Sequence, residues 1–323
     1  MSLFDKIKGL NVFKKSAQPI MPTQLYAYKT RFAMLGPTGS GKTTISAMEV
    51  LAAQTLSADN PSFRCRVLEG TSSVLDAVSS LRQGHFPEKT TAHTRYAAES
   101  GLLLRDKAFF GEKKIQVPMV DIAGEDIDLM IAHYSKSTPN VAPVAYSLAQ
   151  NLINYVKESD GYILCVDSSK ALGVKGYNMP TDEVREDPDN YLHRLLSEIF
   201  IYKEQSRGKP IKGIAVVITK WDTISNYASS WGMDVYDPSG QGLKEFMDVC
   251  FPSTSMILKD YGFGFGANIQ IFPSYIDVER NSDGMPKRWQ DGKERIVVKE
   301  RRMPSCDLQT YINLIQFLLT FAT

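Results

Sequence analysis

Along most of the chain's 323 residues, stretches with a strand-like pattern of hydrophobic and polar positions alternate with stretches that have a helical pattern. Short apolar runs bounded by Gly, Pro or Asp predict buried strands, and apolar residues three and four positions apart predict helices. The predicted strands are 26–36, 95–110, 114–122, 161–169, 211–220 and 268–276. The predicted helices are 42–57, 69–84, 144–160, 190–206, 243–251 and 306–323.

This order of elements predicts the fold class. Strands that alternate with helices favour an α/β fold with a mostly parallel sheet and helices on both faces. The neighbouring strands 95–110 and 114–122 predict one antiparallel hairpin at the edge of that sheet. We find no internal repeat, so we expect a segment and linker at 1–24 and one domain at 25–323. Large insertions are expected at about 55–94, 126–160, 170–187 and 276–305, the last a charged, exposed excursion with a small hairpin.

The composition and net charge limit the classes of protein to which this chain could belong. The chain is 43% hydrophobic and 23% charged, the usual globular mixture, and its net charge of +1 gives no reason to expect a nucleic-acid partner. The four cysteines lie far apart, as expected for reduced thiols of a cytoplasmic protein. No apolar run is long enough to cross a bilayer.

The first fifteen residues form a short amphipathic pattern, with apolar positions near one face and lysines elsewhere. Two interpretations stay open. We favour a helix that docks on its own domain or on a partner. The alternative is weak peripheral attachment of residues 1–15 to an anionic membrane surface.

The strongest motif is GPTGSGKT at 36–43, which fits the pattern G-x-x-x-x-G-K-[ST] between a predicted strand and a predicted helix. Gly36, Gly39 and Gly41 allow a tight turn in which successive N–H groups point inward, toward an anion. The N-terminus of the following helix adds positive potential. The alternative, a glycine-rich turn that carries Lys-Thr by chance, does not account for this context.

The side chains of this loop suit a triphosphate with Mg²⁺. Lys42 supplies a positive charge for the β- and γ-phosphate oxygens, and the Thr43 hydroxyl is a predicted ligand of the metal. The other predicted phosphate contacts in this loop are Thr38, Ser40 and Thr44. A loop of this kind binds the phosphates of ATP and of GTP alike, so it does not determine which base is bound.

Two further motifs follow apolar strands: DIAGE at 121–125 and ITKWD at 218–222. Open α/β sheets bind ligands at the carboxyl ends of their strands. With the phosphate loop, these motifs resemble the boxes of the Ras-like (TRAFAC-class) P-loop GTPases, Asp-x-x-Gly and [Asn/Thr]-Lys-x-Asp. The resemblance extends from about 30 to 275 and includes the closing helix. It implies a three-layer P-loop NTPase fold that binds Mg²⁺ with GTP or GDP.

The resemblance also implies roles for single residues. Asp121 would anchor Mg²⁺, and the Gly124 N–H would meet the γ-phosphate. Lys220 would lie along the base and ribose, and Asp222 would accept both N–H groups of the guanine edge. Adenine presents acceptors there, so Asp222 would face it unpaired. Thr219 is also a predicted base contact; it stands where most of these GTPases have Asn, and dynamin-like GTPases have Thr at this position too.

The two remaining boxes are less well defined. A loop after the last strand should offer a backbone N–H to guanine O6, and the candidates are Ser274 and Tyr275. A threonine before the hairpin should close over Mg²⁺, with Thr90 preferred to Thr91 and Thr94. The pattern G-x-F-P-x-x-T at 84–90, preceded by a helix, resembles the bacterial double-GTPase families.

Glu125 stands where Ras-like enzymes have a glutamine that orients the attacking water. A carboxylate accepts a hydrogen bond from water but cannot donate one to the γ-phosphate. Glu125 is therefore a general base, a water-orienting group that awaits a partner, or a side chain turned outward. We expect slow intrinsic hydrolysis, with Lys42, Glu125 and Thr90 as the catalytic candidates.

The predicted function is a GTP-dependent molecular switch. The γ-phosphate would hold segments 85–96 and 122–136, and hydrolysis would release them to a protein effector or activating protein. Two alternatives remain: a P-loop ATPase in which ITKWD is incidental, and a nucleotide-bound scaffold with negligible hydrolysis. An ordinary acidic turn is the alternative for DIAGED at 121–126.

Overall fold

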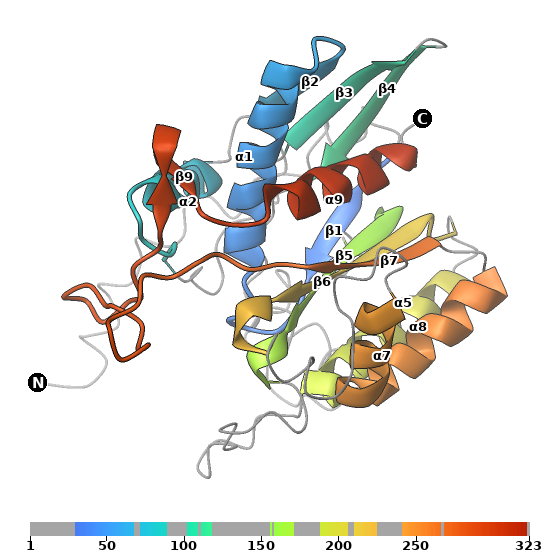
Figure 1. Ribbon diagram of the computed structural model, residues 1–323. Coiled ribbons are helices and arrows are strands. Elements are labelled where there is room, and N and C mark those ends of the chain that lie inside the picture. Colours follow the sequence, from blue (N-terminus) through green and yellow to red (C-terminus); the bar gives the residue numbers. More distant parts are fainter. Residues whose placement is uncertain are drawn as a thin grey trace, which may run out of the picture.

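The computed structural model of the protein describes its central sheet and most of the surrounding elements (Figure 1). The described residues are 30–67, 72–88, 102–108, 111–117, 156, 158–170, 188–205, 210–224, 241–265 and 268–321. The predicted residues outside these ranges are Thr90, Thr91, Thr94, Asp121, Gly124 and Glu125. The segment 1–24 and most of the predicted helix 144–160 also lie outside them.

The centre of the described structure is a parallel sheet of four strands in the order β1-β5-β6-β7 (Figure 1). The strands are β1 (Phe32–Leu35), β5 (Gly161–Asp167), β6 (Gly213–Thr219) and β7 (Asn268–Pro273). The first three of these are buried along their whole length, as expected for strands covered on both faces. The predicted α/β class with a parallel sheet is confirmed, and the carboxyl ends of these strands share one edge.

Helices cover both faces of the sheet (Figure 1). Leu164 and Val166 of β5 pack on one side with α5, α7 and α8, whereas Ile163 and Cys165 pack on the other with α1 and α9. The bounds are α1 (Lys42–Asp59), α5 (Pro188–Gln205), α7 (Gln241–Cys250), α8 (Pro252–Phe265) and α9 (Leu308–Thr320). All but α8 were predicted. In the part of the chain that the structure describes, no helix is both long and apolar enough to span a membrane.

A second, antiparallel sheet lies beside the first. It consists of β2 (Phe63–Val67), β3 (Leu102–Ala108) and β4 (Gly111–Val117), in that order. The predicted hairpin is confirmed, with Ala108 opposite Gly111. The hairpin was expected at the edge of the parallel sheet, but among the described residues it belongs to this separate sheet, where β3 also pairs with β2, part of an expected insertion. β4 contacts β1. The helix α2 (Ser72–Arg82) follows β2 and packs on α1.

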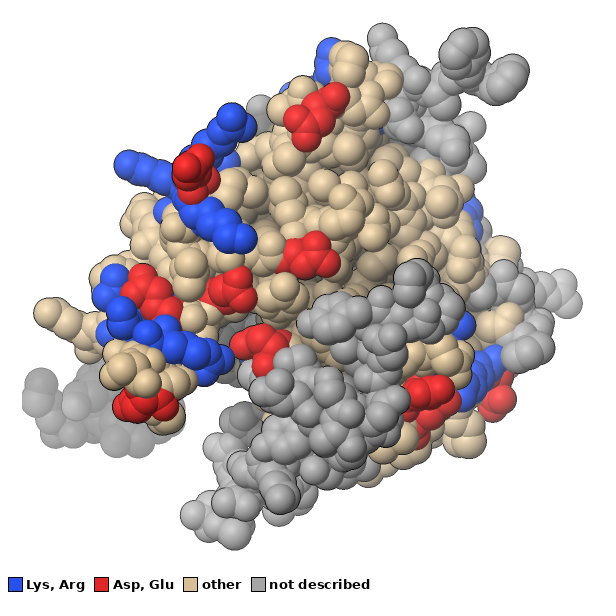
Figure 2. Space-filling model, in the orientation of Figure 1, with Lys and Arg blue, Asp and Glu red and all other residues tan. Residues whose placement is uncertain are grey.

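The charged segment 277–305, here called the excursion, contains the small predicted hairpin of β8 (Val298–Lys299) and β9 (Met303–Pro304). It is anchored where α2 ends. The backbone N–H of Ile296 and the indole N–H of Trp289 both donate to Gly84 O, at 2.9 and 3.1 Å. Many of its charges pair within it, and Figure 2 shows both signs side by side at this end of the molecule. The excursion is thus fixed to the domain rather than merely exposed.

Candidate functional site

Residues 36–43, called the phosphate loop after their predicted role, lie between β1 and α1, so the predicted strand–loop–helix context is confirmed. Gly36, Gly39 and Gly41 have φ angles of 153°, 77° and 84°, which strongly favour glycine. A Cβ atom at Gly36 would lie 2.5 Å from Cys165 O, so no larger residue fits. Gly41 directly precedes the first residue of α1, and the positive end of that helix therefore faces the loop.

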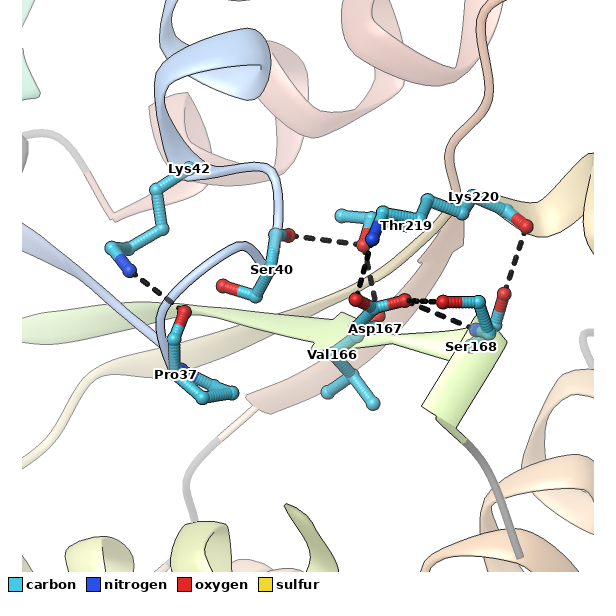
Figure 3. Close-up of polar contacts among 9 residues, drawn as sticks. Pro37, Ser40, Lys42, Val166, Asp167, Ser168, Thr219 and Lys220 are labelled. Atoms are coloured by element: carbon cyan, nitrogen blue, oxygen red, sulfur yellow. Dashed lines mark hydrogen bonds and ion pairs between the residues drawn. The ribbon is translucent and has the colours of Figure 1, made fainter. Parts of the chain in front are cut away.

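Two side chains line this loop from within (Figure 3). The buried ammonium of Lys42 donates to Gly36 O at 2.8 Å and to Pro37 O at 3.0 Å. Ser40 is fully buried, and its Oγ has no hydrogen-bond partner in the described structure. A buried hydroxyl left unpaired costs about 1–3 kcal/mol. The loop thus combines a buried cation, a helix N-terminus and an unsatisfied donor, which together suit an anion.

Thr219 joins the loop to the predicted base box at 219–222 (Figure 3). Its Oγ1 lies 3.0 Å from Ser40 O and 3.2 Å from Val166 O, and its single proton serves one of these carbonyls at a time. A Cβ on Gly41 would approach Thr219 Cγ2 to 3.4 Å. Thr219 was predicted to contact the base, but in this structure its hydroxyl faces the phosphate loop.

Lys220 adopts a left-handed backbone conformation with φ 55° and ψ 35°. Its Nζ lies 2.6 Å from Oδ2 of Asp167, a buried carboxylate at the end of β5 that also accepts from Ser169 N and Oγ at 3.1 and 2.6 Å. The Ser168 hydroxyl donates to Lys220 O at 2.9 Å. Asp167 was not predicted as a site residue, although it ends a buried strand, the position that the sequence also predicts for DIAGE and ITKWD. It fixes the direction of the Lys220 side chain.

Asp222 lies in the one-turn 3-10 helix η5 (Trp221–Thr223), where its side chain is 27% exposed. Its Oδ2 is 3.9 Å from Arg280 Nη2 of the excursion. Burial raises the pKa of Asp222 above its ordinary value. A backbone hydrogen bond and the charge of Arg280 lower this pKa, while Glu294 and Asp277 raise it further. The carboxylate is thus held beside a cation and is still accessible.

The loop after β7 lies directly against the base box. Ser274 N donates to Ile218 O at 2.7 Å, and Trp221 N donates to Ser274 O at 3.0 Å. The Ser274 hydroxyl is 2.7 Å from the hydroxyl of Tyr311 on α9. The Ser274 N–H is thus engaged with Ile218 O, which weighs against Ser274 as the donor to guanine O6. Tyr275 is half-buried against the helical layer.

The predicted magnesium ligands are only partly covered by the structure. Thr43 lies half-buried in the first turn of α1, while Asp121 and Thr90 are outside the described residues. Within those residues there is no cluster of three or more His, Cys, Asp or Glu side chains that could hold a metal ion. The metal site stays a prediction.

At one edge of the sheet, then, the phosphate loop, Asp167, the base box and the loop after β7 come together. Figure 3 shows the contacts of Asp167 and the phosphate loop with Thr219 and Lys220 of the base box. The chain matches no protein-family model and no curated protein in the comparisons. Any statement of function must therefore come from the chemistry of this site.

Proposed function

We propose that the protein binds GTP with Mg²⁺ and hydrolyses it slowly, as a nucleotide-dependent molecular switch. The observation that carries this proposal is the 3.0 Å contact between Thr219 Oγ1 and Ser40 O. It joins two motifs that lie 179 positions apart in the chain. A phosphate loop alone serves either purine nucleotide, whereas a Thr-Lys-x-Asp box held against it supplies a carboxylate that selects guanine.

The phosphate end of the ligand would be held by the N-terminus of α1, Lys42 and Ser40. The unpaired Ser40 hydroxyl supports this assignment, because a phosphate oxygen would satisfy it. Thr43 and the predicted Asp121 would hold Mg²⁺, which neutralises charge on the phosphate oxygens when bound. The residues around the loop thus fit a polyphosphate with its metal.

The base end would be held by Asp222, with Lys220 beside it. We expect Asp222→Asn to weaken GTP binding at least tenfold and to improve xanthosine triphosphate binding, because an amide can donate to the xanthine oxygen and the lost pairs are worth about 1–3 kcal/mol. Competition binding with the two nucleotides measures this. Asp248→Asn, on the exposed face of α7 and paired with Lys259, is the matched control. Unchanged GTP affinity in Asp222→Asn would mean that the base box is misassigned.

The proposed hydrolysis and switching depend chiefly on Thr90 and Glu125, which lie outside the described ranges. Slow intrinsic turnover that rises when a cell extract supplies a partner supports a switch. Turnover that stays negligible with and without the extract favours the nucleotide-bound scaffold. Preference for ATP over GTP favours the P-loop ATPase.

A further inference from the structure

The excursion brings one cation to the predicted base site. Arg280 follows β7 by seven residues, and its Nη2 lies 3.9 Å from Asp222 Oδ2. In Figure 1 the excursion is the orange chain between β7 and β9. The composition of this segment predicted an exposed, charged excursion with a small hairpin, so a contact with Asp222, the predicted base-selecting residue, was not expected.

A tight turn holds the guanidinium of Arg280. Its Nη1 donates to Gly284 O at 3.0 Å. Within that turn Gly284 N donates to Asn281 O at 3.0 Å, and Asn281 N donates to Met285 O at 2.8 Å. Gly284 has a φ of 82°, the left-handed conformation that closes such turns. The turn restricts Arg280, so the arginine loses less side-chain freedom when it faces a ligand.

The neighbouring residues fix this turn to the domain. Glu279 N donates to Arg295 O at 2.8 Å, and the Glu279 carboxylate lies 3.4 Å from Arg295 Nη2 and 3.6 Å from Lys287 Nζ. The Arg295 guanidinium lies over the Trp289 ring at 4.4 Å, and that ring stacks on His85 at 4.2 Å. The position of Arg280 is therefore set by contacts on both sides of the excursion.

We propose that Arg280 is a specificity-determining residue of the base site, which keeps the Asp222 carboxylate charged for the guanine edge. The inference rests on the proposed function. At 3.9 Å the guanidinium is beyond hydrogen-bond distance of the carboxylate. Arg280 thus supplies its charge without taking the acceptor positions that the two guanine N–H groups need.

The charges around Asp222 explain why such a cation is needed. Desolvation raises the pKa of Asp222, and the nearby carboxylates of Glu294 and Asp277 raise it further. Arg280 opposes them, together with the backbone hydrogen bond at Asp222. Without Arg280 the carboxyl would protonate at a higher pH. A protonated Asp222 offers the guanine edge a donor where it needs an acceptor, and the preference for guanine falls.

The test is GTP affinity of Arg280→Gln across a range of pH. We expect roughly fivefold weaker binding near neutral pH, since the pair is partly exposed, and a larger loss as pH falls. The midpoint of that loss should move to higher pH than in the wild type, and Arg280→Lys should restore it in part. Arg64→Gln is the matched control, because Arg64 is an exposed arginine of β2 that also donates to a main-chain carbonyl, Phe63 O at 3.0 Å.

A second experiment separates the effect of the Arg280 charge from any effect of the substitution on the structure. In an Asp222→Asn background, Arg280→Gln should leave xanthosine triphosphate affinity unchanged, because the asparagine carries no charge to maintain. GTP affinity of Arg280→Gln that equals or exceeds the wild-type value at every pH would overturn the proposal, and tighter binding would mean that Arg280 competes with the base. A wild-type protein that does not bind GTP overturns the proposed function as well. GTP binding that is insensitive to Arg280→Gln overturns this inference alone.

Discussion

Lys42→Met is expected to reduce GTP affinity by at least about 100-fold. The Lys42 ammonium is buried inside the phosphate loop, where it already bonds two loop carbonyls. Charge-assisted hydrogen bonds to a phosphate are each worth about 1.5–3 kcal/mol, and the thioether of methionine replaces none of them. Isothermal titration with GTP and Mg²⁺ measures the loss, and circular dichroism checks the fold.

Lys203→Met is the matched control. Lys203 is also buried and also donates to a main-chain carbonyl, Ser159 O at 2.6 Å, but it belongs to α5. We expect this variant to lose stability and to keep its GTP affinity. Near-normal GTP binding by Lys42→Met would contradict the assignment of the phosphate loop.

A second large effect is expected from Glu49, in the middle of α1. Glu49 is fully buried, and neither carboxyl oxygen has a hydrogen-bond partner in the described structure. Burial raises its pKa to about 8. The folded protein therefore keeps this proton over a pH range in which the unfolded chain releases it.

The direction of the pH effect follows from this difference. Between the ordinary pKa of 4.5 and the folded pKa of about 8, the folded state binds more protons than the unfolded state. The contribution of Glu49 to stability thus falls as pH rises through this window. By pH 9 the loss should be about 5 kcal/mol.

Urea unfolding of the wild type, Glu49→Gln and Glu49→Met at several pH values measures this loss. Neither variant has the ionisable group, so the stability of each should rise relative to the wild type as pH increases. Glu49→Gln keeps the size and polarity of the side chain, whereas Glu49→Met removes the buried polar group. Parallel pH profiles for the three proteins would show that the Glu49 carboxyl is not retained in its neutral form.

The helices, strands and loops whose formation is signalled by the local sequence were predicted well. The apolar runs of β5 and β6 and the stripe of α9 have strong local patterns, and the phosphate loop is marked by glycines whose φ angles require them. The two strands of hairpin β3–β4 follow from neighbouring strand patterns, but residues 111–113, expected to lie between the strands, belong to β4. In each case the signal lies within about twenty residues of the chain.

Elements that depend on distant partners were missed. The N-terminus of α8 is capped from α5, because the Asp189 carboxylate accepts from Ser253 N and Thr254 N at 2.9 and 2.8 Å. The residue before α8 is Phe251, which is not one of the usual N-cap residues, so the local start signal is limited to Pro252 at the first position of the helix. β2 is short, and only its pairing with β3 makes it a strand. Neither contact can be predicted from the residues next to it in the sequence.

In the candidate site, too, contacts between residues that are distant in the sequence were not predicted. The motifs indicated Lys42, Lys220 and Asp222, since each belongs to a box with a recognisable spacing. Asp167 and Arg280 belong to no such box, and their contacts with Lys220 and Asp222 depend on how strands and the excursion meet in space. Resemblance therefore identified the residues expected to contact the ligand but not those that position them.

The most direct test of the central claim is competition between GTP and ATP for the wild-type protein with Mg²⁺. A fluorescent guanine nucleotide is bound first, and each unlabelled nucleotide is titrated against it. We predict that ATP must be at least about 100-fold more concentrated than GTP to displace half of the label, because Asp222 would face adenine unpaired. Displacement by ATP at the same or a lower concentration than GTP would contradict the account.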